Sequence, residues 1–238
     1  AVCTRPEIPV QLILTAHGSA DPRSAANARE VARTVAALRR DVDVKVAFCE
    51  QNSPNLRDVL ADSPAGGVVV PLLLADAYHA RVDIPEMIAD ANPAVRQAIK
   101  LAPVLGEDDR LIHVLGQRLT HAGVSRLDSG VGVLVTAVGS SSAAANERTG
   151  TVATGLVAGT HWQATTAFAT GPQANLAEAT ALLLDQGATR LIIAPWFLAH
   201  GRITDRVAEF AAAHRIPMAQ PLGSHRLVAD TVLDRFDA

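Results

Sequence analysis

The sequence predicts an α/β protein that contains two copies of one structural unit. Short apolar runs alternate along the chain with amphipathic segments, and this alternation is typical of parallel strands joined by crossover helices. The same order of runs and segments occurs twice, at an offset of about 120 residues. We therefore expect two small parallel sheets, each flanked by helices.

The first unit begins with a buried strand and an amphipathic helix. Residues 10–16 (VQLILTA) form a continuous apolar run that ends in His-Gly-Ser, which suits a strand buried on both faces and closed by a turn. Residues 24–40 then place Ala28, Val31 and Val35 at helical spacing, with charged residues between them. This segment is predicted to be a helix with one face against the sheet.

The other elements of the first unit follow in order along the chain. A second strand is predicted over 44–49. Ser53 and Pro54 have the pattern of an N-cap with proline at the first helical position, which predicts a short helix through Leu60. The later elements are a strand, a helix, a short strand and a helix, expected over 67–74, near 84–89, near 99–102 and over 110–121.

The second unit begins after Gly130. Residues 131–137 (VGVLVTA) and the Val-Gly-Ser that follows them parallel residues 10–19. Further matches keep a similar offset: Ala47-Phe48 with Ala167-Phe168, Asn55-Leu56 with Asn175-Leu176, Val70-Pro71 with Ala194-Pro195, and Val104-Leu105-Gly106 with Pro221-Leu222-Gly223. Because the matches include Gly, Pro and Asn outside the strands, they indicate a duplication. The repeat predicts domains at 1–124 and 129–238, with a linker near 123–130.

The composition is that of a globular chain. Hydrophobic residues make up 49% of it and charged residues 19%, and its formal net charge of -3 gives no overall attraction to nucleic acid. Cys3 and Cys49 are too far apart to indicate a zinc motif or a disulfide framework. No stretch approaches the roughly 18 apolar residues of a membrane span, and residues 1–10 lack the pattern of a secretory leader. We expect a cytoplasmic protein without a nucleic-acid or membrane partner.

Three polar residues follow the first three predicted strands. His17 and Glu50 end the first and second strands, and His79 lies five residues beyond the third. Ligands of open parallel sheets bind beyond the carboxyl ends of the strands, so all three side chains could face one cleft. Two imidazoles and a carboxylate suit Fe, Co, Ni or Zn, and they can also accept protons near neutral pH. The sequence therefore predicts a metal site in the first unit.

Each of these residues also has an ordinary structural explanation. A histidine after a strand is often a turn or surface residue, and Glu50 alone could cap the helix after Ser53. The second unit offers an internal comparison, because the same offsets place Val138, Thr170 and a residue near Ile203 at the three positions. All three polar groups are lost together. This joint loss favours one site in the first unit over three independent surface residues.

These residues lie in segments that resemble the class II sirohydrochlorin chelatases. Residues 15–19 (TAHGS) and 71–74 (PLLL), followed by 79–85 (HARVDIP), are similar to the two signatures of that family. Residues 48–50 (FCE), followed by 53–56 (SPNL), resemble a third family segment. The resemblance covers essentially the whole chain, because longer members of the family are also two fused copies of the short form.

The resemblance implies two tandem flavodoxin-like, chelatase-type domains with a tetrapyrrole cleft between them. The implied activity is insertion of Fe2+ or Co2+ into sirohydrochlorin for sirohaem or cobalamin synthesis, with no cofactor beyond the metal substrate. By motif match, His17 and His79 are the metal-binding and proton-accepting pair, and Glu50 assists them. The family usually has Gly two residues before the second histidine, where this chain has Ala77, so we expect a changed loop there.

The eight carboxylates of sirohydrochlorin require cationic and hydrogen-bonding groups. Arginine suits this task because it binds carboxylates in bidentate fashion. The candidates from both units are Ser19, Arg23, Arg81, Ser140 and Arg202. The alternative is that the arginines are solvated surface residues and that the serines cap helices.

Two other functions are compatible with the same residues. One is a chelatase for another tetrapyrrole or metal, such as a nickel or haem-pathway enzyme, because imidazole and carboxylate ligands discriminate weakly among these metals. The other is a carrier that binds metal or tetrapyrrole without turnover. Because two halves are fused in one chain, a second copy is not needed to complete the cleft, and we expect a monomer.

Overall fold

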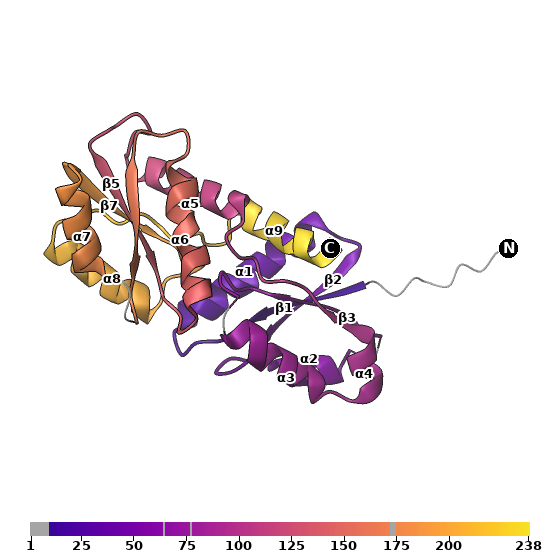
Figure 1. The fold of residues 1–238 in the computed structure, drawn as a ribbon. Coiled ribbons are helices and arrows are strands. Elements are labelled where there is room, and N and C mark those ends of the chain that lie inside the picture. Colours follow the sequence, from indigo (N-terminus) through magenta and orange to yellow (C-terminus); the bar gives the residue numbers. More distant parts are fainter. Residues whose placement is uncertain (1–9, 64, 77, 172–174) are drawn as a thin grey trace. The chain divides into compact units, whose positions relative to one another are not determined.

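A computed structural model describes residues 10–63, 65–76, 78–171 and 175–238 (Figure 1). The chain forms two compact units, the first from residues up to Leu105 together with 229–238, and the second from 106–228. Each unit is a parallel sheet with helices on both faces, which confirms the predicted fold class. Within the described residues no helix is both long and apolar enough to cross a membrane.

The first unit contains four parallel strands in the order β2-β1-β3-β4. One face of this sheet packs against three short helices through a cluster that includes Ile13, Leu56 and Ile84, all fully buried. The strands are β1 (Val10–Ala16), β2 (Val42–Phe48), β3 (Gly67–Pro71) and β4 (Ile99–Leu101), and these helices are α2 (Leu56–Ala61), α3 (Ile84–Ala89) and α4 (Pro93–Ala98). Helix α1 (Pro22–Leu38) lies on the opposite face (Figure 1).

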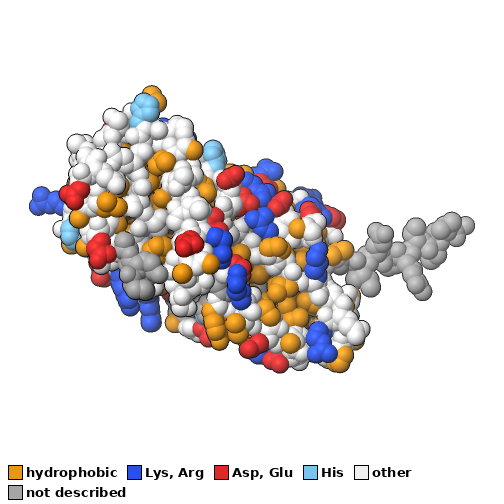
Figure 2. Space-filling view, in the orientation of Figure 1, with side chains coloured by type: hydrophobic (Ala, Val, Ile, Leu, Met, Phe, Trp, Pro, Cys, Tyr) orange, Lys and Arg blue, Asp and Glu red, His pale blue; other side chains and the backbone are white. Residues whose placement is uncertain are grey.

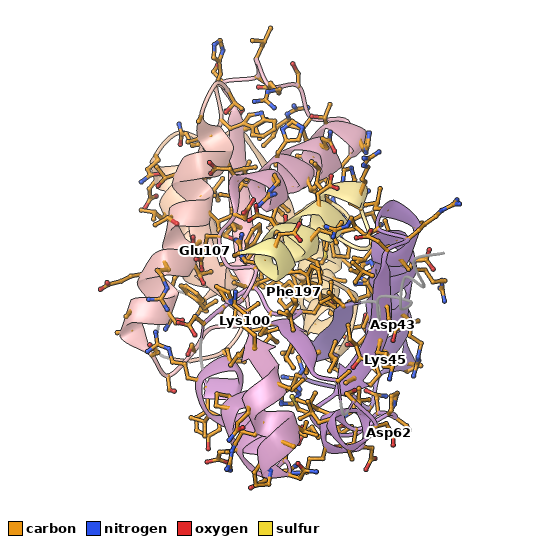
Figure 3. The ribbon with its side chains drawn as sticks, turned by 90° about the vertical axis from the view of Figure 1, so that its right-hand side faces the viewer. Asp43, Lys45, Asp62, Lys100, Glu107 and Phe197 are labelled. Carbon is orange, nitrogen blue, oxygen red and sulfur yellow. The ribbon has the colours of Figure 1, made fainter. Side chains whose placement is uncertain are left out.

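Both edges of the first sheet carry charged residues. Asp43 and Lys45 lie on the edge strand β2, and Lys100 lies on the edge strand β4 (Figure 3). Asp43 also accepts a hydrogen bond from Nε2 of Gln11 at 3.1 Å. Charged side chains on an edge strand disfavour pairing with a strand of another molecule. Acidic and basic groups are likewise interspersed over the surface seen in Figure 2.

The second unit contains three parallel strands in the order β6-β5-β7. Leu134, Leu183 and Val207 belong to the core between this sheet and two of its helices. On the other face two helices pack closely, because Gly155 allows the side chain of Ile112 to approach its backbone. The elements are α5 (Asp109–His121), β5 (Val131–Ala137), α6 (Ala143–Val157), β6 (Gln163–Phe168), α7 (Leu176–Asp185), β7 (Arg190–Pro195) and α8 (Arg202–Ala213).

The two units exchange the last helix of each sequence repeat. Helix α5 belongs to the first repeat but packs in the second unit, where Arg118 donates to the carbonyl oxygens of Pro221 and Leu222 at 3.0 and 2.9 Å. Most of α9 (Arg226–Asp237) packs in the first unit, where Arg235 donates to the carbonyl oxygens of Val104 and Leu105 at 2.9 and 2.8 Å. The boundary at 1–124 and 129–238 describes the repeat and stays a prediction.

The segment around Ser53 differs from its prediction. The N-cap of α2 is Asn55, whose Oδ1 accepts from the backbone N–H of Arg57 at 2.9 Å. The N–H of Phe48 donates to the carbonyl oxygen of Pro54 at 3.0 Å, so Pro54 extends the sheet pairing instead of starting the helix. The prediction that Ser53 caps this helix is therefore wrong, and so is the alternative that Glu50 caps it.

The region after the third strand contains more helical segments than predicted. β3 ends at Pro71, and a π-helix, η1 (His79–Asp83), precedes α3. Helix α4 was not predicted either, although Asn92 caps it and Pro93 stands at its first position. Its six residues are too few for a clear periodic pattern.

Replacing Arg235 by Ala should destabilise the first unit. The guanidinium is only 18% exposed and satisfies two carbonyl groups, so we expect a loss of about 1–3 kcal/mol in the free energy of unfolding. Urea denaturation would measure it. Arg33→Ala, which removes an exposed pair with Glu30, is the control and should cost less than about 0.5 kcal/mol. Equal losses in the two variants would contradict the structural role of Arg235.

Candidate metal site

The loops after β1 and β2 lie side by side at the carboxyl edge of the first sheet. The N–H of Cys49 donates to the carbonyl oxygen of Ala16 at 3.1 Å, and the N–H of Glu50 donates to that of His17 at 3.0 Å. These bonds continue the β1–β2 ladder past the strand ends. His17 and Glu50 are therefore held next to each other by backbone geometry.

Gly18 makes this close approach possible. Its φ of 103° lies in the region that favours glycine, and an added Cβ would collide with the carbonyl oxygen of Glu50. Oδ1 of Asn52 accepts from the N–H of Ser19 at 2.7 Å and fixes the turn from the other side. Sequence reasoning missed Asn52. It lies between residues 48–50 and 53–56, which resemble the family, but nothing in the sequence marked Asn52 itself.

The His17 ring is oriented by its own loop. Nδ1 lies 3.0 Å from the carbonyl oxygen of Gly18. Because a carbonyl can only accept, Nδ1 carries the proton, and Nε2 holds the lone pair in the neutral ring. A metal-binding histidine is commonly oriented in this way, with its second nitrogen donating to a carbonyl. His17 is thus prepared to bind a metal ion or to accept a proton through Nε2.

A carboxylate lies beside that nitrogen. Oε1 of Glu50 is 3.6 Å from Nε2 of His17, and the same oxygen accepts from Nε2 of Gln51 at 3.0 Å. The side chains of His17 and Glu50 are 26% and 53% exposed, so water and ligands can reach both. Gln51 has a φ of 59°, which is unusual for a residue with a side chain and occurs mostly where the surroundings impose it.

The third predicted residue is placed only by its backbone. His79 opens η1, which continues into α3 after the end of β3. Its side chain lies outside the described part of the structure, as does Ala77. Among the described side chains there is no group of three or more metal-binding residues. The structure brings His17 and Glu50 together, and the contribution of His79 stays a prediction.

Cys49 is the residue before Glu50, but its thiol is not in the form that binds metal. Burial, reinforced by the charges of Asp83 and Glu50, raises the pKa of its thiol to about 11. The thiolate is the form that binds metals, so the raised pKa favours imidazole and carboxylate over this thiol as ligands.

The candidate carboxylate-binding residues of the first unit are already engaged. Nε and Nη2 of Arg23 donate to the carboxylate of Asp21 at 3.0 and 2.7 Å, and Nη2 of Arg81 donates to Oδ2 of Asp76 at 2.8 Å. The pair with Asp76 raises the pKa of Arg81, so its charge is permanent. Oγ of Ser19 accepts from the N–H of Asp21 at 3.0 Å. The Arg81–Asp76 pair is exposed on both sides, and such pairs contribute little stability, so a ligand carboxylate can replace Asp76.

The candidates in the second unit differ from each other. Ser140 belongs to the turn before α6, where its N–H and carbonyl oxygen bond the Asn146 side chain at 2.8 and 2.7 Å. Its hydroxyl oxygen accepts from the N–H of Ser142 at 3.1 Å, and Ser142 is the serine that caps α6. Arg202 is exposed at the first position of α8, with no acidic partner in the described part of the chain. Of these two, Arg202 remains available to an anionic ligand.

The second unit repeats the backbone of the site without its ligands. The N–H groups of Ala169 and Thr170 donate to the carbonyl oxygens of Ala137 and Val138 at 2.8 and 3.0 Å, as the bonds at Ala16 and His17 do in the first unit. Gly139, with a φ of 87°, takes the place of Gly18. The position of His17 is occupied by Val138, which is 42% exposed. The loop geometry is therefore retained, while Val138 and Thr170 stand in the positions of His17 and Glu50.

Comparison with known proteins gives consistent matches. The CbiX family model matches residues 11–122 and 132–238. A sirohydrochlorin cobaltochelatase of Methanococcoides burtonii is 32% identical over 83 residues, which are 33% of this chain and 63% of that relative, less than two thirds of its length. A sirohydrochlorin ferrochelatase of Priestia megaterium is 25% identical over 228 residues, 90% of this chain and 84% of the relative.

A solved structure shares the fold. SirB from Bacillus subtilis, determined with Fe3+, superimposes with a TM-score of 0.81 at 21% identity, covering 96% of this chain and 94% of SirB. The agreement over both units shows that the fold is that of a known two-unit α/β protein.

Replacing Gly18 by Ala should disrupt the candidate site. The positive φ and the collision with the Glu50 carbonyl require the two loops to separate, at a cost of about 1–3 kcal/mol in the free energy of unfolding. Gly150→Ala is the matched control, because nothing lies near its added Cβ inside α6, and it should stabilise by about 0.5–1 kcal/mol. Denaturant unfolding would compare them, and a neutral Gly18→Ala would show that the loops are not in close contact.

The alkylation of Cys49 should follow its raised pKa. In a Cys3→Ser background, the rate of reaction with iodoacetamide should keep rising up to pH about 11 in the folded protein, because only the thiolate reacts. In urea the same rate should level off near the ordinary thiol pKa of about 8.5. A folded protein whose rate levels off at that lower pH would show that the thiol is solvated.

Proposed function

The chain belongs to the CbiX family, and from this premise we propose that it is a sirohydrochlorin chelatase, which inserts Fe2+ or Co2+ into the tetrapyrrole. Both curated relatives carry a chelatase activity on sirohydrochlorin in their names, one with cobalt and one with iron. The observation that carries the proposal is the oriented His17 ring, with Glu50 beside Nε2 at the carboxyl edge of the first sheet.

The reaction has two requirements that these residues can meet. Two pyrrole N–H groups must lose their protons, and the metal must exchange its water ligands for ring nitrogens. Nε2 of His17 holds a lone pair that can bind the metal or accept a proton, and Glu50, 3.6 Å away, can pass that proton to solvent. A site with few protein ligands suits this task, because the metal must leave it in every turnover.

The remaining roles follow from the residues around this pair. His79 is the second metal-binding and proton-accepting residue, contributed by the start of η1. Arg23, Arg81 and Arg202 bind substrate carboxylates, the first two by exchanging their aspartate partners for the ligand. The divalent metal is a substrate, and the proposal requires no other cofactor. One copy of the chain is sufficient for it.

His17→Ala and His79→Ala should each lose metal insertion while remaining folded. We expect a decrease of about a hundredfold or more in turnover, the range of a general acid–base contribution. Catalytic amounts of protein would be incubated anaerobically with sirohydrochlorin and Fe2+ or Co2+, and the absorbance change followed against a protein-free sample. His113→Ala is the control, because that histidine is exposed and its only hydrogen bond through the ring, among the described residues, is with Gln117.

The same experiment separates the alternatives. Full activity in both histidine variants, or loss of their circular dichroism spectrum, would contradict the assigned roles. Tetrapyrrole binding by the unaltered chain without multiple turnovers would indicate a carrier. Activity only with other tetrapyrroles or with Ni2+ would indicate a chelatase of another pathway.

A further inference from the structure

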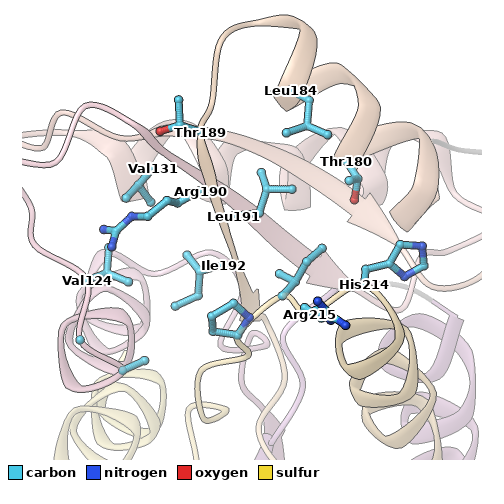
Figure 4. A pocket seen from close by; sticks show the side chains of 14 residues that line it. Val124, Val131, Thr180, Leu184, Thr189, Arg190, Leu191, Ile192, His214 and Arg215 are labelled. Carbon is cyan, nitrogen blue, oxygen red and sulfur yellow. The ribbon is translucent and has the colours of Figure 1, made fainter.

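The second unit contains a pocket at the amino ends of its strands. Its volume is about 600 Å³, and it lies where β5 starts at Val131 and β7 starts at Arg190 (Figure 4). Its walls are mainly apolar, with Leu184, Leu191 and Ile216 among the lining residues. Pockets of this size and character accommodate small organic molecules. It is at the opposite end of the sheet from the turn that carries Val138.

The pocket lies beside an edge where the second sheet lacks the fourth strand of the first. In the first unit, β4 pairs with β3, and the N–H of Ala102 donates to the carbonyl oxygen of Val69 at 2.9 Å. The N–H of Ala219 makes the same bond to Ile193 at 2.9 Å, so Ala219 corresponds to Ala102 and Pro217 to Lys100.

Pro217 stops the ladder at that point. In the first unit Lys100 pairs with Val68, but a proline in its place has no N–H to donate to Leu191. The second sheet therefore has only an isolated bridge between Ile193 and Met218, and β7 remains an edge strand. Ile216 and Pro217, which correspond to Ile99 and Lys100 of β4, line the pocket together with Leu191.

Arg215 stands at the rim of the pocket in a conformation that favours glycine. Its φ is 53°, and it forms the turn that ends α8, where the N–H of Ile216 donates to the carbonyl oxygen of Ala211 at 2.8 Å. The same turn ends two other helices of this unit, and there the corresponding residues are Gly123 and Gly187, with φ of 91° and 97°. An arginine in this position is strained where glycine is not. A strained residue that persists points to a role for its side chain.

The charged residues that line the pocket are all of one sign. None of the 14 lining residues, all in the described part of the chain, is acidic. Arg190 lines the pocket too, but its guanidinium pairs with Asp128, and Nδ1 of His214 bonds the carbonyl oxygen of Phe210 at 2.9 Å. Arg215 has no acidic partner among the described residues. An apolar pocket with one uncompensated guanidinium is complementary to an anion with an apolar body.

We propose that this pocket binds a small molecule that has an apolar body and one carboxylate, with the body beside Leu191 and the carboxylate on the Arg215 guanidinium. The site is separate from the candidate metal site and does not depend on the chelatase activity. The guanidinium supplies two parallel N–H donors to the carboxylate, and the apolar walls exclude water from the remainder of the ligand.

Octanoate and octan-1-ol are suitable probes, because they share an apolar chain and differ in charge. Titration of the full chain, followed by amide chemical shifts, should show octanoate perturbing Leu191, Ile192 and Ile216. Arg215→Gly should weaken octanoate binding by about tenfold or more, because both charge-assisted hydrogen bonds of the guanidinium are lost, and it should leave octanol binding unchanged. Arg206→Ala, which removes an exposed arginine of α8 outside the pocket, should bind octanoate as the unaltered chain does.

Arg215→Gly also tests whether the arginine is retained at the expense of stability. Because glycine relieves the strain, the melting temperature should rise by about 2–4 °C. A lower melting temperature would assign Arg215 a structural role and overturn the proposal. Equal octanoate affinity in both proteins, or shifts confined to other parts of the chain, would overturn it too.

Discussion

The candidate site depends on the backbone pairing that continues past the ends of β1 and β2. The bond from the Glu50 N–H to the His17 carbonyl holds the two loops at one separation, and Gly18 is the residue that permits it. Every side-chain distance in the site follows from this contact, including the 3.6 Å between Nε2 of His17 and Oε1 of Glu50. The second unit keeps the same pairing at Val138 and Thr170, so the contact is a property of the fold and the chemistry is added to it.

The two units differ in the side chains at the carboxyl edge of the sheet and in the pairing of one strand. In the first, His17 and Glu50 lie together at the carboxyl edge, and β4 pairs with β3. In the second, Val138 replaces the histidine, and Pro217 ends the ladder and leaves β7 open. The two substitutions lie at opposite ends of the second sheet. The repeat thus provides a comparison within one chain, because each of these positions in the second unit has a counterpart in the first.

Much of the site could be predicted because strand ends are visible in the sequence. Apolar runs locate β1 and β2, and the residues that follow parallel strands meet at one edge, which placed His17 and Glu50 together. Asn52 and Gln51 could not be predicted in the same way, because their roles depend on the turn conformation that brings their amides to Ser19 and Glu50. A local sequence pattern contains no information about such a distance.

The sequence by itself determined the α/β class, the two tandem units and the polar residues that follow the strands, because these depend on periodicity and on residue type. Only the tertiary structure decided that α5 and α9 are exchanged between the units. The arginines that fix these helices bind carbonyl groups more than 100 residues away, at Pro221 for Arg118 and at Val104 for Arg235. An arginine on a helix gives no sign of which carbonyl it will meet, since that is decided when the whole chain packs.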